Sequence, residues 1–297
     1  MPELPDVTVY VESLAAKVQG GTLQRVRLLN PFVLRTAVPP IGEAEGRTVQ
    51  GIERLGKRIV VALSGGLFLV IHLMIAGRLK WLAAGAKPPG GKATLAVLEF
   101  DAGQLVLTEA GTQRRASVHL LPDRAALRAM DPGGIDVLTA DLPTFVTRLQ
   151  SENHTLKRAL TDARLFSGIG NAYGDEVLHR ARLSPVTLTR NLTAEQIRRL
   201  YVSTQQVMRE WTERLRAEAA AAGGWPGKVT AFRPEMAVHG RYGQPCPVCG
   251  TPVQRIVHAD NETNYCARCQ TEGRLLADRA LSRLLKASWP KRVDDLD

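Results

Sequence analysis

The chain has 297 residues, a length that suits two domains, because a single hydrophobic core rarely extends beyond about 250 residues. Hydrophobic residues make up 44% of the sequence, which excludes a disordered tail. The sequence contains no run of about 18 apolar residues, so it predicts no membrane span. Lysine and arginine number 39 against 29 acidic residues. The net charge of +10 favours a polyanionic partner, nucleic acid above all, although a basic ribosomal or membrane-surface protein has a similar composition.

The first half of the chain predicts one helix followed by antiparallel strands. Apolar residues keep helical spacing over 6–18, and Gly20 and Gly21 end that run. Two pairs of strand-patterned segments follow, each pair around a glycine-containing turn: 59–63 with 67–73, and 94–100 with 104–109. This order predicts a sandwich-like first domain that ends near the turn at 131–134.

The second half predicts helices. Short helices are expected at 156–165 and 172–183, joined by a glycine-rich segment. Thr193 and Gln196 have the spacing of a capping box, which begins a long helix that ends before the Gly-rich segment 223–227. We expect that segment to be a mobile loop.

The cysteines predict a metal site. Cys246, Cys249, Cys266 and Cys269 form two Cys-x-x-Cys pairs separated by sixteen residues, and the rest of the chain contains no cysteine. Four thiolates in this spacing suit one structural zinc ion with no open coordination position. An iron–sulfur site and four free cysteines are the alternatives. The clustering indicates a reducing compartment, and no signal peptide pattern is present, so we expect a prokaryotic cytoplasmic protein.

The chain begins Met-Pro-Glu-Leu-Pro-Asp, a pattern typical of a helix start. A second interpretation is chemical. If the initiator methionine is removed, Pro2 becomes a secondary amine with a pKa of about 8, far below that of a lysine. Such an amine can attack a sugar C1′, and Glu3 beside it could transfer protons.

Four stretches carry a family resemblance. They are MPELPD at the start, RLGKRIVVALSGGLFLVIHLMIAGRL at 54–79, LKRALTDARLFSGIGNAYGDEVLHRARLSP at 156–185, and FRPEMAVHGRYGQPCPVCG continuing into CARCQ. With these the chain resembles the formamidopyrimidine-DNA glycosylase/endonuclease VIII family of base-excision-repair enzymes. The resemblance implies an α+β fold: an N-terminal β-sandwich with a leading α-helix, then a helix-two-turn-helix domain and a C-terminal zinc finger. The implied limits are 1–134, 135–240 and 241–273, with a C-terminal extension at 274–297.

The same resemblance implies a bifunctional DNA glycosylase and abasic-site lyase. Pro2 matches the nucleophile that forms a Schiff base, Glu3 its acid–base partner, and Lys57 the lysine of the lyase step. The implied reaction excises oxidised bases of the formamidopyrimidine or 8-oxoguanine type and cleaves the strand by β,δ-elimination. The damaged nucleotide must leave the duplex stack for this chemistry.

The implied partner is double-stranded DNA with a damaged base or an abasic site, bound by a monomer in the nucleoid. Asn171 matches a phosphate-binding residue at a helix start, and Lys157 matches another position of the same module. Arg114 matches the arginine that faces the orphaned base. Met74 and Ile75 lie in the turn that the family inserts into the duplex.

Several residues depart from the family pattern. Asp6 replaces a glutamate, Ile75 occupies the position of the inserting methionine while Met74 takes that of a glycine, and Ala116 stands where one branch has an inserting phenylalanine. In the finger, Asn261 replaces an arginine that contacts phosphates. The Gly223–Thr230 loop is also shorter than the corresponding loop of the formamidopyrimidine branch.

These departures keep alternatives open. They are an endonuclease VIII-like enzyme for oxidised pyrimidines, a non-catalytic binder of damaged DNA, and a zinc-ribbon protein of an RNA or ribosome context. The tail predicts a helix with an apolar stripe at Leu275, Leu276, Ala280, Leu284 and Leu285. We expect this helix to pack on the protein itself, and a docking peptide for another repair protein is the alternative.

Overall fold

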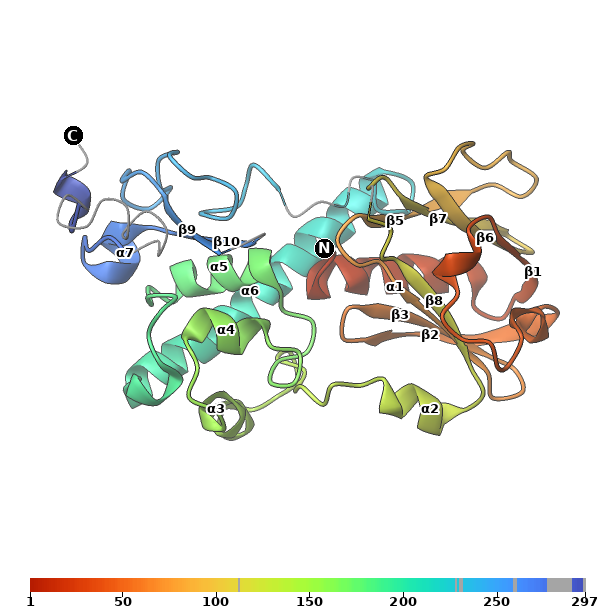
Figure 1. The fold of residues 1–297 in the computed structure, drawn as a ribbon, viewed down its shortest axis with the longest axis horizontal. Helices are drawn as coiled ribbons and strands as arrows, with labels where there is room; N and C mark the ends of the chain where they lie inside the picture. Colours follow the sequence, from red (N-terminus) through yellow and green to blue (C-terminus); the bar gives the residue numbers. More distant parts are fainter. Residues whose placement is uncertain (112, 228, 230–231, 259–260, 277–289, 296–297) are drawn as a thin grey trace. The chain divides into compact units, whose positions relative to one another are not determined.

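The computed structural model describes the chain except residues 112, 228, 230–231, 259–260, 277–289 and 296–297. It divides into two compact units (Figure 1). The first unit comprises residues 1–132 and 211–230, and the second comprises 133–210 and 231–297. The domain limits expected from the sequence stay a prediction.

The first unit contains the leading helix and the strands. Helix α1 spans Leu4–Val18, and α2 spans Arg124–Ala129. The strands are β1 Thr22–Leu28, β2 Arg47–Leu55, β3 Arg58–Leu63, β4 Phe68–His72, β5 Gly77–Leu82, β6 Thr94–Phe100, β7 Gly103–Glu109 and β8 Ser117–Leu121, with 3-10 turns at Pro31–Val33 and Ile41–Ala44. The helix at the start and the two hairpins β3–β4 and β6–β7 confirm the prediction.

The eight strands pair in the order β5-β7-β6-β1-β2-β3-β4-β8. Strands β1 and β2 share only two residue pairs, so the order separates into two four-stranded halves. Inward-facing apolar residues of both halves join those of α1 in one buried cluster, as expected of two sheet faces packed together. Helix α1 packs against β2 and β3 within that arrangement (Figure 1). The predicted sandwich with a leading helix is therefore confirmed.

The second unit is helical, with a small hairpin. Its helices are α3 Leu142–Gln150, α4 Leu156–Thr161, α5 Asn171–Arg180 and α7 Ala267–Thr271, and its strands are β9 Gln254–His258 and β10 Asn261–Tyr265. Helix α6, Ala194–Ala221, continues from this unit into the first. Thr193 and Gln196 exchange backbone-to-side-chain hydrogen bonds of 2.9 and 3.2 Å at its start, which confirms the capping box.

Two helices are shorter than predicted. Helix α4 ends at Thr161 rather than 165, because Asp162 is extended and its carboxylate accepts a hydrogen bond from the Arg164 backbone N–H (2.9 Å). Helix α5 ends at Arg180 rather than 183, because Arg182 adopts a left-handed conformation with φ 51°.

The parts of the tail that are described pack on the finger. Leu275, Leu276 and Val293 join Ile256 and Tyr265 in a buried cluster. Residues 277–289, with the rest of the predicted helical stripe, lie outside the described residues. Within the described part of the chain, none of the helices combines the length and the apolar composition of a membrane span.

Candidate active site and nucleic-acid interface

The start of α1 buries two carboxylates. Glu3 is the N-cap, and the Asp6 carboxylate accepts a 3.0 Å hydrogen bond from the Glu3 backbone N–H in a capping box. Glu3 is 3% exposed and Asp6 is 4% exposed, and Pro2 before them is also buried. The shorter Asp6 that replaces the family's glutamate therefore still holds the first turn of the helix.

Charges of both signs surround the chain start. Burial lowers the pKa of the Met1 amine, and the positive charges of Arg78 and Lys57 lower it further. The negative charges of Glu3 and Asp6 act in the opposite direction. The charge of Lys57 thus acts on the start of the chain, where the other two predicted catalytic residues, Pro2 and Glu3, lie. Their roles in catalysis stay predictions.

Lys57 lies in the tight turn between β2 and β3, where Gly56 has a positive φ of 60°. Its neighbour Arg58 pairs across the sheet with His72 of β4. Burial and then the charges of Arg58 and Lys57 lower the pKa of His72 to about 4, so this histidine is neutral at pH 7. His72 therefore adds no positive charge of its own to those of Arg58 and Lys57.

Met74 and Ile75 form a tight turn between β4 and β5. Met74 has a positive φ of 52°, the conformation that a glycine in its position would adopt freely. Gly77 closes the turn, because a Cβ there would lie 2.2 Å from the Leu73 carbonyl oxygen. The Ile75 side chain is 64% exposed. The turn therefore presents an apolar side chain to solvent, as an inserting residue requires.

The Arg114 loop connects β7 and β8. Glu109 is 2% exposed, and its carboxylate accepts a 2.9 Å hydrogen bond from the Ala116 backbone N–H, which closes the base of the loop. Ala116 is 2% exposed and packs in the sandwich core, so it has no access to a duplex. Arg114 itself is exposed.

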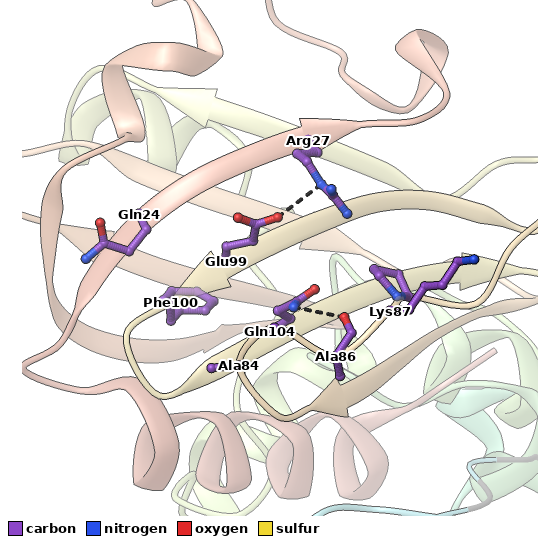
Figure 2. Close-up of a pocket in the computed structure, with 10 residues that line it drawn as sticks. Gln24, Arg27, Ala84, Ala86, Lys87, Glu99, Phe100 and Gln104 are labelled. Carbon is purple, nitrogen blue, oxygen red and sulfur yellow. Dashed lines mark hydrogen bonds and ion pairs between the residues drawn. The ribbon is translucent and has the colours of Figure 1, made fainter.

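Two adjoining hollows lie in the first unit, and one of them reaches this loop. The hollow at Arg114 is basic, with Arg27, Lys87 and Lys92 also in its wall. The adjoining hollow contains the Arg27–Glu99 ion pair (3.1 Å) and Gln104, which donates to the Ala86 carbonyl (Figure 2). The predicted catalytic residues line neither hollow.

Lys157 and Asn171 lie together in the second unit. Lys157 Nζ donates to the Asn171 carbonyl and to Asp175 Oδ1, each at 2.5 Å. Asp175 is fully buried, and its other oxygen accepts from His239 Nδ1 (2.8 Å) and the Asn264 backbone N–H (3.1 Å). A buried ionic network therefore joins α4, α5 and the finger hairpin.

The α5 start is also tied to the finger. Asn171 Nδ2 donates to the Glu262 carbonyl oxygen (2.8 Å), so this predicted phosphate ligand supports hairpin β9–β10. The Glu176 carboxylate accepts from three consecutive backbone N–H groups at 237–239. Asn261, which stands in place of the family's arginine, begins β10 and is exposed. Arg255 forms an ion pair with Glu262 (3.1 Å) across the hairpin.

The four cysteine sulfurs fit a single tetrahedral ion. All lie within 4.8 Å of one another, with Cys249–Cys266 at 3.4 Å and Cys246–Cys269 at 4.0 Å. A zinc ion with bonds of about 2.3 Å requires sulfurs separated by about 3.8 Å. His179 of α5 is buried and places Nε2 3.3 Å from Cys246 Sγ.

Sequence reasoning did not find four residues of these sites: Arg78, Asp175, His179 and His239. Each acts through a contact with a residue distant in the sequence, such as Asp175 with His239. The only local signal was the cluster of polar residues around Asp175 and Glu176 on a helix that otherwise has apolar neighbours.

Two segments match domains of one enzyme family, and a third matches a zinc finger that this family shares with IleRS. Residues 1–117 match the formamidopyrimidine-DNA glycosylase N-terminal domain, 134–219 match its H2TH domain, and 243–271 match the zinc finger found in FPG and IleRS. Curated relatives agree. The chain is 35% identical to the formamidopyrimidine-DNA glycosylase of Thermus thermophilus, over 92% of this chain and 100% of the relative. It is 32% identical to that of Solibacter usitatus, over 91% and 99%.

Solved structures agree with this match. The MutM (Fpg) protein of Thermus thermophilus superposes with a TM-score of 0.75 at 34% identity, over 91% of this chain and 98% of that chain. Lactococcus lactis Fpg in complex with Fapy-dG-containing DNA gives a TM-score of 0.79 at 25% identity, over 91% and 100%. The same protein with abasic-site DNA gives 0.79 at 26%, over 91% and 99%.

Proposed function

The chain belongs to the formamidopyrimidine-DNA glycosylase family, and from this membership we propose that it excises an oxidised base from duplex DNA and cleaves the strand at the resulting abasic site. The observation that carries the proposal is the chain start, where Pro2 and Glu3 are buried and the charges of Lys57 and Arg78 act on the Met1 amine that precedes them. The Lactococcus lactis relative with Fapy-dG and abasic DNA supports the choice of substrate.

The proposed chemistry uses Pro2 after removal of Met1. The lone pair of the Pro2 nitrogen attacks C1′, the glycosidic bond breaks, and the base leaves with a proton. Glu3 then donates a proton to O4′ as the sugar ring opens, which leaves an iminium between Pro2 and C1′. Loss of a C2′ proton breaks the C3′–O3′ bond, and loss of a C4′ proton breaks the C5′–O5′ bond. Water finally hydrolyses the iminium and frees Pro2.

Other residues would hold the DNA. Lys57 lies beside the chain start and suits the phosphate next to the lesion, with no specificity for base. Ile75 and Arg114 are exposed on turns of the same unit and suit insertion into the stack that the flipped nucleotide leaves. The basic hollow at Arg114 supplies further positive charge for phosphates.

We propose that Cys246, Cys249, Cys266 and Cys269 hold one structural zinc ion. The sulfur separations fit its tetrahedron, and four protein ligands leave no open position for a reactant. The ion would stabilise the fold of the finger and with it hairpin β9–β10, which Asn171 and Asp175 anchor to α5.

Borohydride trapping tests the proposal. Wild-type protein should form a covalent complex with abasic duplex, and Pro2→Gly should form none. Glu3→Gln should bind the same duplex but excise bases far more slowly. Intact-mass measurement should show that Met1 is absent. A wild-type protein that traps no abasic or oxidised substrate would refute the enzyme proposal and favour a non-catalytic binder of damaged DNA.

A second lesion class is favoured by one observation. Buried Ala116 leaves the Arg114 loop without an aromatic wedge, which is where the chain departs from the formamidopyrimidine branch. Oxidised pyrimidines, the substrates of an endonuclease VIII-like enzyme, are therefore the second candidate. Excision rates on matched duplexes with 8-oxoguanine, Fapy-dG and an oxidised thymine distinguish the two.

A further inference from the structure

Arg78 is the second residue of β5, directly after the Met74–Ile75 turn, and its guanidinium makes three hydrogen bonds to main-chain carbonyls. Nη1 donates to the carbonyls of Ile75 (3.1 Å) and Gly77 (2.7 Å), and Nε donates to that of Val229 (2.6 Å). The side chain is half-buried. The Arg78 guanidinium therefore links the turn to a segment that follows about 150 residues later in the chain.

The turn needs such support. Met74 has a Cβ and adopts the left-handed conformation, which is unfavourable for residues other than glycine. Ile75 is exposed, so the packing of its side chain does not fix the turn. The hydrogen bond from Arg78 to the Ile75 carbonyl acts on the residue directly after the strained Met74.

The segment after α6 is anchored to the same strand. The Trp225 ring lies 5.7 Å from Tyr10 and 6.0 Å from Trp81 between ring centroids, and its Nε1 donates to the Leu79 carbonyl (3.3 Å). Val229 is buried in the sandwich core. Trp225 is therefore anchored beside β5, and the expectation that the segment 223–227 is a mobile loop stays a prediction.

Arg78 also acts on the chain start. Its positive charge and that of Lys57 oppose protonation of the Met1 amine, one residue before Pro2, while the carboxylates of Glu3 and Asp6 favour it. Tyr10, the other titratable group near Arg78, has a pKa raised to about 12 by burial and is neutral at pH 7. The charge of Arg78 thus acts on the start of the chain, together with that of Lys57.

We propose that Arg78 is a positioning residue of the base-excision reaction, which fixes the Met74–Ile75 turn against the segment after α6 and sets a positive charge beside the nucleophilic amine. The proposal rests on the function proposed above, because it requires the amine at the chain start to be the nucleophile. It assigns two separable effects to one side chain. Its hydrogen bonds act on the geometry of insertion, and its charge acts on the pH at which the amine is reactive.

Two variants separate these effects. Arg78→Lys keeps the charge but loses the three-way hydrogen bonding, and Arg78→Met loses both. The rate of borohydride trapping on abasic duplex is measured from pH 5 to pH 9 under single-turnover conditions. Lys80→Met is the matched control, because Lys80 is an exposed cation on the same strand. Thermal unfolding of each variant checks that the fold is retained.

We expect Arg78→Met to move the midpoint of the pH–rate profile upward by about half a unit to one unit, because the amine is protonated more readily without the cation. Arg78→Lys should leave the midpoint in place and lower the plateau rate about tenfold through misplacement of the turn. Lys80→Met should change neither. In a double-mutant cycle, Arg78→Lys and Ile75→Ala should be non-additive, because both act on the same turn.

The possible failures are distinguishable. If the wild type itself traps no DNA, the proposed function is wrong. If the wild type traps DNA but both Arg78 variants keep its midpoint and plateau rate, the function stands and the role of Arg78 is refuted. Additive effects of Arg78→Lys and Ile75→Ala would likewise overturn the positioning of the turn.

Discussion

The Asp175→Asn substitution tests the buried network of the second unit. The Asp175 carboxylate is fully buried and accepts hydrogen bonds from Lys157 Nζ (2.5 Å), His239 Nδ1 (2.8 Å) and the Asn264 backbone N–H (3.1 Å). An asparagine keeps the shape but removes the charge, and its NH₂ group faces a donor. The Lys157 side chain is only 13% exposed and would be left without its counter-ion. Breaking a buried pair in this way costs about 3–5 kcal/mol.

The loss is large against the total stability of a domain, which is on the order of 5–15 kcal/mol. Urea unfolding followed by circular dichroism at 222 nm reports the helices of this unit. Glu210→Gln is the matched control, because Glu210 pairs with Arg180 at an exposed site where the cost should stay below about 1 kcal/mol. If Asp175→Asn and Glu210→Gln lower the free energy of unfolding by the same amount, the network does not stabilise the unit as argued.

Three further outcomes follow from the structure. Ile75→Ala should leave stability within about 0.5 kcal/mol but weaken binding to abasic duplex roughly tenfold or more, measured by fluorescence anisotropy; unchanged binding would exclude insertion. His72 binds a proton below about pH 6.5 in the unfolded chain but only near pH 4 in the folded chain. The free energy of unfolding should therefore fall by about 2 kcal/mol between pH 7 and pH 5 because of this residue, and in His72→Gln the decrease measured by urea unfolding should be smaller by that amount. His179→Phe removes the donor to Cys246 and should weaken zinc retention about 10–100-fold in competition with a chelator, whereas equal retention would show that the contact is incidental.

Local patterns predicted the leading helix and four of the eight strands of the first unit. The β3–β4 and β6–β7 hairpins follow from glycines between strand-patterned runs, and in both cases the observed strands agree with the prediction within one residue at most ends. The cysteine spacing likewise predicted one four-sulfur cluster. These features depend on residues close together in the sequence, so their physics is local.

Helix ends, and features that depend on distant contacts, could not be predicted in this way. The helix ends at Thr161 and Arg180 depend on a side-chain hydrogen bond of Asp162 and on the backbone conformation of Arg182. Trp225 lies in a glycine-rich segment that predicts a loop, yet its ring packs against two aromatic residues of α1 and β5. Composition indicates where a chain lacks regular structure, and it does not indicate where that part of the chain is anchored.

The departures from the family pattern are explained by where each side chain lies. Ala116 belongs to the sandwich core, and Glu109 holds its backbone, so the β7–β8 loop offers exposed arginines but no apolar wedge. The opposite turn has an exposed isoleucine after a strained methionine. If both positions contributed equally to insertion, the loss of one wedge would weaken recognition of every lesion. From the contacts of Arg78 we propose instead that insertion would depend mainly on the Ile75 turn, because Arg78 holds this turn and Met74 within it is strained.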